Sequence, residues 1–281
     1  MAAREPVTLT ISIVVYYSPK QQLEALLDSL LTALNALPAA GLDVLAHVSL
    51  VDNSEKPHLS ANDFDSHRKR LQASGGSLHL LTGHGNVGYG RGHNLVIESH
   101  DHPYHLILNP DLELEPDSLA VGLHYLEQHP EAALVSPAAQ AVDGDKQYLC
   151  KRAPSLLTLF IRGFCPAWIK QRFSARLARY EMHDLPEDRP SSDIPHVSGC
   201  FMLCRADALR EVRGFDGNYF LYFEDFDLSR RLSSKGRVVY LPAMKIRHLG
   251  GNAAGKGISH VALFTRSAWR FFSTWGWRFI Q

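Results

Sequence analysis

Hydrophobic runs alternate with amphipathic stretches along the first half of the chain. Residues 8–17, TLTISIVVYY, form a β-branched run that is typical of a strand buried on both faces. Leucines then recur at helical spacing over residues 23–34, which predicts an amphipathic helix. Ser18 suits the N-cap of this helix, Pro19 its first position and Gln21 the return contact of a capping box.

The alternation of strands and helices continues downstream. We expect further strands at residues 44–51, 78–82, 104–108, 133–136, 197–203 and 237–241, and a helix at residues 118–128. This order indicates an α/β fold with an open, mostly parallel sheet flanked by helices. A hairpin turn is predicted at residues 143–145, whereas residues 151–195 are basic, aromatic and interrupted by prolines, without a clear period.

Polar residues follow three of the expected strands. Asp52 comes directly after the second strand, a glycine-rich loop at residues 83–92 after the third, and Asp111 after the fourth. Ligands of open α/β sheets bind beyond the carboxyl ends of the strands. We therefore expect these three features to border one binding site.

The glycine-rich loop has two interpretations. Residues 83–88, GHGNVG, satisfy the G-x-G-x-x-G pattern of dinucleotide-binding folds, but they follow the third strand and not the first. The continuation YGRGHN is also too rich in glycine for a helix that begins at Gly88. We favour a loop whose backbone and whose Asn86, Arg91 and Asn94 side chains face a phosphorylated ligand, with a flexible turn as the alternative.

Asp111 is the candidate metal ligand of the sequence. Pro110 keeps Asn109 extended, so that Asp111 is directed outward from the end of a buried strand. A Mg²⁺ or Mn²⁺ ion that bridges this carboxylate to a diphosphate fits the preference of hard cations for oxygen ligands. An Asx-type turn is the alternative for Asp111, and a structural role is the alternative for His248, which follows the last expected strand.

Three carboxylates, Glu224, Asp225 and Asp227, stand within four residues among aromatic side chains. In a helix, Asp227 would have Arg230 and Arg231 three and four positions onward and would be neutralised locally. Glu224 and Asp225 lack such partners, and the dipole at a helix N-terminus would keep both ionised. An ionised carboxylate in a partly apolar pocket can accept a proton from a hydroxyl, whereas a solvated acidic helix start is the alternative.

Charge and cysteine content narrow the function classes. Twenty-nine Lys and Arg balance 29 Asp and Glu, which argues against a nucleic-acid partner. Cys200 and Cys204 lie in an apolar run and are interpreted as buried thiols, with zinc ligation as the alternative. The N-terminus has no apolar signal sequence and no apolar run reaches membrane-spanning length, so we expect a cytoplasmic protein.

The basic residues are unevenly distributed. Residues 151–180 contain seven Lys or Arg and residues 243–281 contain six, and neither segment contains Asp or Glu. In residues 260–280, aromatic side chains alternate with arginines. This pattern fits a C-terminal helix packed on the domain and an association with a membrane surface equally well.

Six segments in order resemble the family 2 glycosyltransferases with the GT-A fold, and within them the bacterial rhamnosyltransferase branch. The segments are TISIVVYYSP, VSLVDNSE, GNVGYGRGHN, LILNPDLEL, VSGCFMLCRADALREVRGFDGNYFLYFEDFDLSRRL and IRHLGG. The resemblance implies one continuous GT-A domain. Its nucleotide-sugar-binding half would be residues 1–140, and its acceptor-binding and catalytic half, with the basic-aromatic C-terminal segment, residues 141–281.

The resemblance also implies roles for individual residues. The expected nucleotide-sugar contacts are Val15, Tyr16, Asp52, Asn86, Gly88, Arg91, Asn94 and Asn109. Asp111 would hold the metal at the position of the family's D-x-D motif, with Asn109 in place of the first acid, and His248 would complete the metal site. Asp225 matches the general base, and Glu224 would support the base or the acceptor.

The function implied is an inverting, metal-dependent transfer of a sugar to a hydroxyl group. The favoured donor is dTDP-rhamnose, and the acceptor a cell-surface glycan or glycolipid such as lipopolysaccharide or a lipid-linked oligosaccharide, at the inner face of the cytoplasmic membrane. A nicotinamide-dependent oxidoreductase is one alternative, but it leaves the Glu224–Asp225 pair without a role. A non-catalytic nucleotide-sugar-binding module is the other, and it leaves Asp111 and Asp225 without one.

Overall fold

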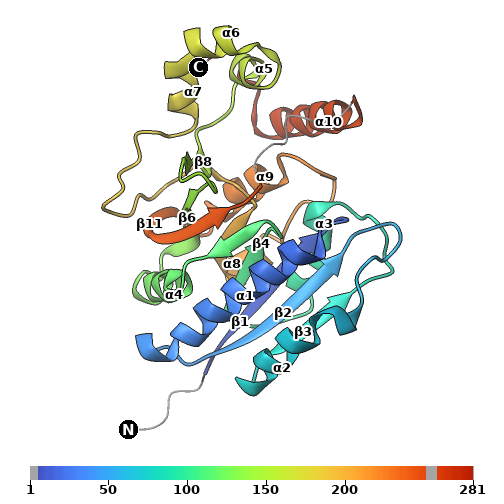
Figure 1. Cartoon of the computed structure of the whole chain (residues 1–281). Coiled ribbons are helices and arrows are strands. Elements are labelled where there is room, and N and C mark those ends of the chain that lie inside the picture. The colour runs from blue at the N-terminus through green and yellow to red at the C-terminus, as the bar shows by residue number, and fades with distance from the viewer. Residues whose placement is uncertain (1–5, 251–257, 281) are drawn as a thin grey trace.

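A curved sheet of nine strands runs through the molecule, and helices cover both of its faces (Figure 1), while two further strands form a small separate sheet. The structure is a computed structural model that describes residues 6–250 and 258–280. Its strands are β1 (Val7–Val15), β2 (Val44–Asp52), β3 (Ser77–Leu81), β4 (Tyr104–Leu108), β5 (Leu112–Leu114), β6 (Ala132–Gln140), β7 (Lys146–Gln147), β8 (Cys150–Lys151), β9 (His196–Val197), β10 (Phe201–Arg205) and β11 (Arg237–His248). Its α-helices are α1 (Lys20–Ala36), α2 (Asp65–Ala73), α3 (Tyr89–Ile97), α4 (Ser118–Gln128), α5 (Leu156–Phe164), α6 (Ala167–Arg172), α7 (Ser174–Tyr180), α8 (Ala206–Glu211), α9 (Glu224–Leu232) and α10 (Ile258–Trp275).

The sheet changes character halfway across. Its strand order is β3-β2-β1-β4-β10-β6-β11-β5, with β7 paired to β6. The first four strands are parallel, as expected from their alternation with helices. Beyond β4 the sheet is mixed, because β10 runs antiparallel to both β4 and β6 while β11 runs parallel to β6. The fold is therefore an α/β fold that brings the ends of β1, β2 and β4 to one edge.

Strand β1 is buried on both faces, as its β-branched sequence predicted. Leu9, Ile11 and Ile13 are fully buried in a core that they share with the leucines of α1. On the opposite face Ser12 contacts the rings of His93 (2.7 Å to Nδ1) and His105 (2.8 Å to Nε2). This double burial fixes the position of the chain where β1 ends.

The first helix differs from its prediction at the N-terminus. Pro19 is the N-cap residue with extended ψ (133°), α1 begins at Lys20, and no side chain caps it, so the Ser18–Gln21 capping box was wrong. By length and composition the stretch Lys20–Ala40 could also cross a membrane, contrary to our expectation that no such run exists. Its leucines, however, are buried against the sheet, as expected for a core helix.

Helix α3 begins at Tyr89 with Gly88 as its N-cap, although the glycine content argued against a helix there. The glycines permit close packing of this helix. A Cβ on Gly90 would lie 2.7 Å from Cβ of Phe215, and one on Gly92 would lie 2.9 Å from Cγ2 of Val14. Close contact with the sheet and with residue 215 therefore compensates the low helix propensity of glycine.

The C-terminal half contains more regular structure than its sequence suggested. The predicted turn at residues 143–145 joins β6 to β7, but residues 156–180 form three short helices, α5 to α7. The strand expected at residues 197–203 is divided into β9 and β10, and β11 continues to His248. Helix α10 packs on the domain through Ala268, Phe271 and Phe272, next to Phe223 and α5.

Candidate active site

A cleft of about 780 Å³, here called the strand-end cleft, opens where the parallel strands end. Val15 and Tyr16 reach it from the end of β1, Asn86 and Gly88 from the glycine-rich loop, and Asn109 and Asp111 from the end of β4. The cleft thus brings together six of the predicted site residues from three separate segments. Asn53, Tyr17 and Tyr89 also line it and were not predicted.

Asp52 does not line the strand-end cleft. Its side chain is fully buried and accepts backbone N–H groups of Ser54 (3.1 Å), His58 (3.0 Å) and Leu59 (3.3 Å). Burial raises the pKa of Asp52, but the hydrogen bonds from Ser54 and His58 outweigh it and hold the pKa below its ordinary value. Asp52 therefore fixes the loop beside the cleft.

Asn53 takes the position at the cleft that we expected for its neighbour. Its amide Nδ2 donates to the carbonyl of Gly88 (2.9 Å), and its Oδ1 lies 2.9 Å from Nε2 of His84. Gly88 has a positive φ of 88°, and a Cβ there would lie 2.6 Å from the carbonyl oxygen of Phe220. The end of β2, the glycine-rich loop and Phe220 are thus held together as one wall.

Arg91 and Asn94 lie outside the strand-end cleft, on the side of α3 that faces residues 215–217. Arg91 Nε donates to the carbonyl of Gly217 (2.7 Å). Asn94 bonds the backbone of Phe215 twice, with Nδ2 as donor (2.8 Å) and Oδ1 as acceptor (2.8 Å). Both side chains tie α3 to the segment that leads to the acidic cluster.

Asp111 and His248 lie next to each other, as expected for a shared metal site. His248 Nε2 is 3.3 Å from Asp111 Oδ2, and His248 Nδ1 is 2.5 Å from Gln147 Oε1. A Cβ on Gly250 would lie 1.9 Å from the same carboxylate oxygen, so only glycine leaves room for Asp111 here. Among the described residues, Oδ1 of Asp111 and Oδ1 of Asn109 are buried without a hydrogen-bond partner.

These donors fit a divalent cation in part. One carboxylate, one amide oxygen and one imidazole are compatible with Mg²⁺ or Mn²⁺ when a ligand supplies further oxygens. The described part of the chain holds no group of three His, Cys, Asp or Glu side chains placed to bind a metal by themselves. The buried cysteines Cys200 and Cys204 are free thiols, and burial raises the pKa of Cys200 to about 12, which agrees with a structural role.

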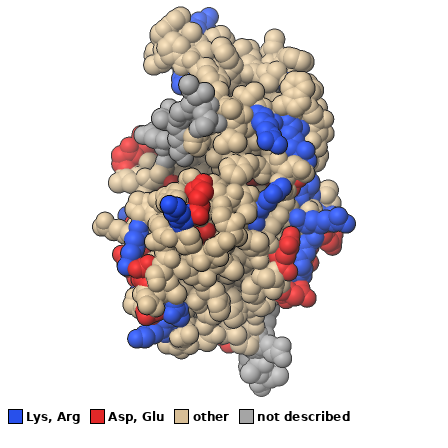
Figure 2. Space-filling view, turned by 90° about the vertical axis from the view of Figure 1, so that its right-hand side faces the viewer, with Lys and Arg blue, Asp and Glu red and all other residues tan. Residues whose placement is uncertain are grey.

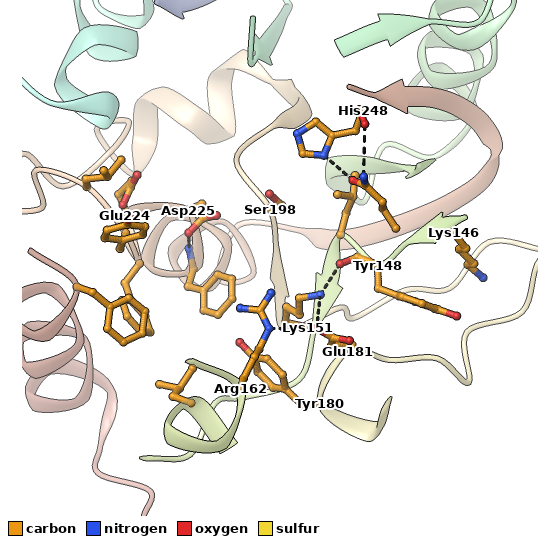
Figure 3. A pocket seen from close by; sticks show the side chains of 18 residues that line it. Lys146, Tyr148, Lys151, Arg162, Tyr180, Glu181, Ser198, Glu224, Asp225 and His248 are labelled. Carbon is orange, nitrogen blue, oxygen red and sulfur yellow. Dashed lines mark hydrogen bonds and ion pairs between the residues drawn. The ribbon is translucent and has the colours of Figure 1, made fainter. Parts of the chain in front are cut away.

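A second cleft, of about 540 Å³, contains the acidic pair and is here called the carboxylate cleft (Figure 3). Glu224 and Asp225 line one side of it, at the start of α9. Lys151, Arg162 and Glu181 line the opposite side, with Glu181 Oε1 3.8 Å from Lys151 Nζ and 3.1 Å from Arg162 Nε. Burial lowers the pKa of Lys151 to about 8.

The two carboxylates of the pair have different environments. Asp225 is half-buried, and its Oδ2 accepts the backbone N–H of Gly199 (2.9 Å) while its Oδ1 accepts that of Phe226 (2.8 Å). Glu224 is 4% exposed, and its buried Oε2 has no partner among the described residues. The helix dipole was expected to keep both ionised, but for Glu224 burial outweighs the dipole.

The pKa shifts of the pair follow from this difference. Burial, and then the adjacent charge of Asp225, raise the pKa of Glu224 well above its ordinary value. Burial also raises the pKa of Asp225, but the N–H groups of Gly199 and Phe226 oppose the rise. Asp225 is therefore the carboxylate that ionises first, and Glu224 holds its proton to a higher pH.

The third acid, Asp227, is structural, as predicted. Its Oδ2 accepts from Arg231 Nε (2.7 Å) and its Oδ1 from Trp275 Nε1 (2.9 Å) of α10. Arg230, the other predicted partner, instead lies over the ring of Trp275 at 4.6 Å. The pairing with Arg231 and Trp275 anchors α9 to α10.

The backbone before α9 is strained. Tyr222 and Phe223 both have positive φ, of 72° and 64°, although neither is glycine. Left-handed backbone at such residues costs about 1–3 kcal/mol each and persists where packing over-determines it. Phe223 is packed against Phe271 and Phe272 of α10, with ring centroids 5.2 and 6.4 Å apart. This packing turns the chain so that Glu224 and Asp225 face the cleft.

The two clefts meet. Leu221 lines both of them, and the contact between Asp111 of one cleft and His248 of the other crosses their boundary. The segment between β9 and β10 connects the two sets of residues, because Gly199 donates to Asp225 while the carbonyl of the next residue, Cys200, accepts the N–H of Asn109 (2.8 Å). A ligand in the strand-end cleft and one in the carboxylate cleft could therefore touch.

Two solved structures share the fold of this chain. Over 95% of its length the chain is similar to the crystal structure of GalNAc-T7 with UDP, GalNAc and Mn²⁺, with a TM-score of 0.66 and 13% identity. It is also similar to the crystal structure of TarS 1-349 of S. aureus, with a TM-score of 0.58 and 14% identity. This similarity covers 95% of this chain and 72% of the TarS chain. The chain spans about half, 48%, of the GalNAc-T7 chain. Both are GT-A glycosyltransferases, and the protein has their fold.

The family follows from the sequence. The model of the family described as "Glycosyltransferase like family 2" matches residues 13–269, so the chain belongs to this family of glycosyltransferases. It is 27% identical over 211 residues to the N-acetylglucosaminyl-diphospho-decaprenol L-rhamnosyltransferase of Mycobacterium tuberculosis (strain ATCC 25618 / H37Rv), covering 70% of this chain and 67% of that protein. It is 30% identical over 178 residues to the rhamnosyltransferase WbbL of Escherichia coli (strain K12), covering 58% and 61%. The chain is thus a rhamnosyltransferase-like member of family 2, as its sequence motifs indicated.

Proposed function

We propose that this glycosyltransferase transfers rhamnose from dTDP-rhamnose to a hydroxyl group of a glycolipid acceptor, with inversion at the anomeric carbon. The observation that carries the proposal is the meeting of the two clefts. The donor would lie in the strand-end cleft and the acceptor in the carboxylate cleft. The reacting hydroxyl would then approach Asp225 on the side of the sugar opposite the diphosphate.

On the donor side, Val15, Tyr16, Asn86, Gly88 and Asn109 are proposed to contact the nucleotide-sugar, because they line the strand-end cleft. The other predicted donor residues are proposed to act indirectly. Asp52 holds the loop after β2, and Arg91 and Asn94 hold α3 against residues 215–217.

The metal site is proposed to be Asp111, with His248 next to it and Asn109 as a further oxygen donor. A bound Mg²⁺ or Mn²⁺ would neutralise the charge that develops on the departing diphosphate. Gly250 leaves the space that the Asp111 carboxylate occupies, and Gln147 orients the His248 ring. In metal sites such hydrogen bonds to a ligating histidine fix its orientation.

Asp225 is proposed as the general base. The N–H groups of Gly199 and Phe226 fix its carboxylate and favour its ionised form. Glu224, which holds its proton to a higher pH, would donate a hydrogen bond to the acceptor or to Asp225 and would not compete for the proton of the acceptor hydroxyl.

The choice of donor and acceptor is supported by the relatives. Both are named as rhamnosyltransferases, and the name of the mycobacterial protein specifies an N-acetylglucosaminyl-diphospho-decaprenol acceptor. For this chain we propose a glycan on a lipid carrier or lipopolysaccharide as the acceptor class. The reaction would then take place at the cytoplasmic face of the membrane.

The experiment is a thermal-shift series followed by a turnover assay. The protein is heated with dTDP-rhamnose, UDP-N-acetylglucosamine or NADH, each with Mn²⁺ and with EDTA, because bound ligand raises the apparent Tm. We expect the largest rise with dTDP-rhamnose and Mn²⁺, and release of dTDP on addition of a glycolipid acceptor. A rise with NADH alone would support the oxidoreductase alternative, and donor binding without dTDP release would support a binding module.

A further inference from the structure

Large apolar side chains are exposed mainly at one end of the molecule. In α5 and α6, Phe160, Phe164 and Trp168 are 58%, 56% and 71% exposed, and in the C-terminal segment Trp269 and Phe279 are 66% and 65% exposed. Isolated exposed apolar residues are ordinary, but a cluster of large aromatic ones marks an interaction surface.

The two segments form one surface although they lie about a hundred residues apart in the sequence. Backbone N–H groups at the start of α5 bond the C-terminal segment, from Leu156 to the carbonyl of Arg278 (2.9 Å) and from Leu157 to that of Phe279 (3.2 Å). Beneath the surface, Leu159 of α5 shares a buried cluster with Phe271 of α10. In Figure 1 the helices α5, α6, α7 and α10 accordingly lie together at the top of the molecule.

The charge of this end is of one sign. Residues 156–180 and 258–280, which form α5 to α7 and the C-terminal segment with α10, contain eight Lys or Arg and no Asp or Glu. No ion pair joins Lys170, Arg172 or Arg266 to a carboxylate among the described residues. In Figure 2 the uppermost part of the molecule shows Lys and Arg among uncharged residues and no Asp or Glu.

Exposed aromatic rings interspersed with unpaired cations are the composition of interfacial membrane-binding elements. The rings enter the headgroup region and the cations are attracted to anionic lipids. We infer that α5, α6 and residues 269–280 form a membrane-docking surface for an anionic lipid bilayer. A globular protein partner would need acidic side chains at positions that match these cations. A bilayer of anionic lipids needs no such match, because its phosphates can meet cations at any spacing.

Helix α5 connects this surface to the carboxylate cleft. Its residues Leu159 and Arg162 line the cleft, while Phe160 and Phe164 point to the outside. The cleft therefore lies one helix away from the docking surface, so that an acceptor sugar on a membrane lipid could reach Asp225. This link to the acceptor rests on the proposed function, whereas the docking itself does not.

The test is co-sedimentation of the full chain with vesicles of phosphatidylcholine, alone or mixed with phosphatidylglycerol, at low and high salt. We expect binding to the mixed vesicles that weakens at high salt. The double variant Phe164→Ser, Trp168→Ser should weaken it on the order of tenfold or more. Lys170→Gln with Arg172→Gln should weaken it by about fivefold per residue.

The controls are exposed residues elsewhere on the molecule. Val142→Ser, at a side chain that is 73% exposed, and Lys69→Gln with Arg189→Gln should leave vesicle binding unchanged. All these variants are expected to keep the Tm of the parent, because none of the changed side chains is buried. Equal losses in the control variants, or no binding of the parent protein to mixed vesicles, would overturn the inference.

Two further measurements distinguish membrane docking from self-association and from catalysis. Sedimentation velocity tests a second copy as the partner: if the parent protein is a dimer that Trp168→Ser dissociates, and vesicles are not bound, the surface is a dimer interface and the inference is wrong. The variant Asp225→Asn should bind vesicles like the parent protein. The double variant Phe164→Ser, Trp168→Ser should transfer the sugar to a water-soluble acceptor at the rate of the parent. Vesicle binding without any sugar transfer would contradict the proposed function but not the docking surface.

Discussion

Residues 6–140 place their site residues at the ends of parallel strands, whereas the acidic pair Glu224 and Asp225 lies at the start of one helix, α9, which is held by aromatic packing. In the N-terminal half, β1, β2 and β4 are buried by regular hydrophobic patterns and end at the same edge of the sheet. In the C-terminal half, α9 is fixed by Phe223 against α10 and by a strained backbone. The first arrangement follows from local sequence and the second from contacts between distant segments.

This difference suggests a division of labour. In the proposed function, the end of the parallel sheet would bind the donor, and the short helices around the aromatic core would hold the acid pair and the acceptor. Substitutions can test the roles of the two halves independently, because changes in the N-terminal half should affect donor binding and changes in α9 should affect transfer of the sugar.

The largest effect is expected for Asp225→Asn. Without a proton acceptor, transfer should fall by about 10²–10⁴-fold. Donor-induced thermal shifts should remain, because the strand-end cleft is untouched, and Asn can still accept the N–H of Gly199. Turnover and Tm are measured side by side with Asp227→Asn, which should lower Tm through the contact with Arg231 and retain activity per folded molecule. Normal turnover of Asp225→Asn would exclude it as the base.

Asp111→Ala should weaken donor binding at least about tenfold and remove its dependence on Mn²⁺. The measurement is titration of dTDP-rhamnose with Mn²⁺ and with EDTA. Asp43→Ala, at an exposed position beyond the opposite end of the strands, serves as the matched control and should bind like the parent. If Asp111→Ala binds donor normally in EDTA and in Mn²⁺ alike, the metal role is wrong.

Gly90→Ala tests the close packing of α3. The added Cβ would lie 2.7 Å from Cβ of Phe215, and such overpacking lowers the free energy of unfolding by about 1–3 kcal/mol. Each kcal/mol lost should lower Tm by about 2–4 °C. Gly163→Ala in α5 is the control, because nothing lies within 4 Å of its added Cβ, and helix propensity should make it neutral or slightly stabilising. Equal Tm values for the two variants would contradict the packing argument.

Glu224→Gln should change activity least. Because the raised pKa of Glu224 favours its protonated form, an amide reproduces its hydrogen-bonding pattern. Turnover near neutral pH should then stay within about threefold, compared with about 10²-fold or more for a lost base. A loss of the latter size would make Glu224 the base.

The same variant should show a pH-dependent gain in stability. The pKa of Glu224 is raised in the folded protein, so its favourable contribution is complete at acidic pH and is lost as the pH rises toward the folded-state pKa. Glu224→Gln lacks this loss, so its Tm relative to the parent should increase from acidic to alkaline pH. A constant difference in Tm would show that the pKa of Glu224 is not raised.

Much of the N-terminal half could be predicted from the sequence. Strand β4 and helix α4 have the expected bounds. The reason is that a short apolar run between turns predicts a buried strand, and apolar residues at helical spacing predict a helix. The start of α3 could not be predicted, since the benefit of Gly90 arises from its contact with residue 215. Likewise the sequence predicted Asp52 at the cleft, but Asn53 lines it instead, because burial of the Asp52 carboxylate depends on the loop that folds over it.

In the C-terminal half, spacing predicted Arg230 and Arg231 as partners of Asp227, and Arg231 makes the ion pair, since residues four apart on a helix meet wherever the helix lies. The sequence thus determined the four parallel strands of the sheet, the family and the short-range ion pair, all of which depend on residues close in the chain or on their order. Only the tertiary structure decided that Glu224 is the buried and Asp225 the hydrogen-bonded member of the pair, and that His248 reaches Asp111. The reason is that burial, and therefore protonation, depends on side chains that the sequence separates and the fold brings together.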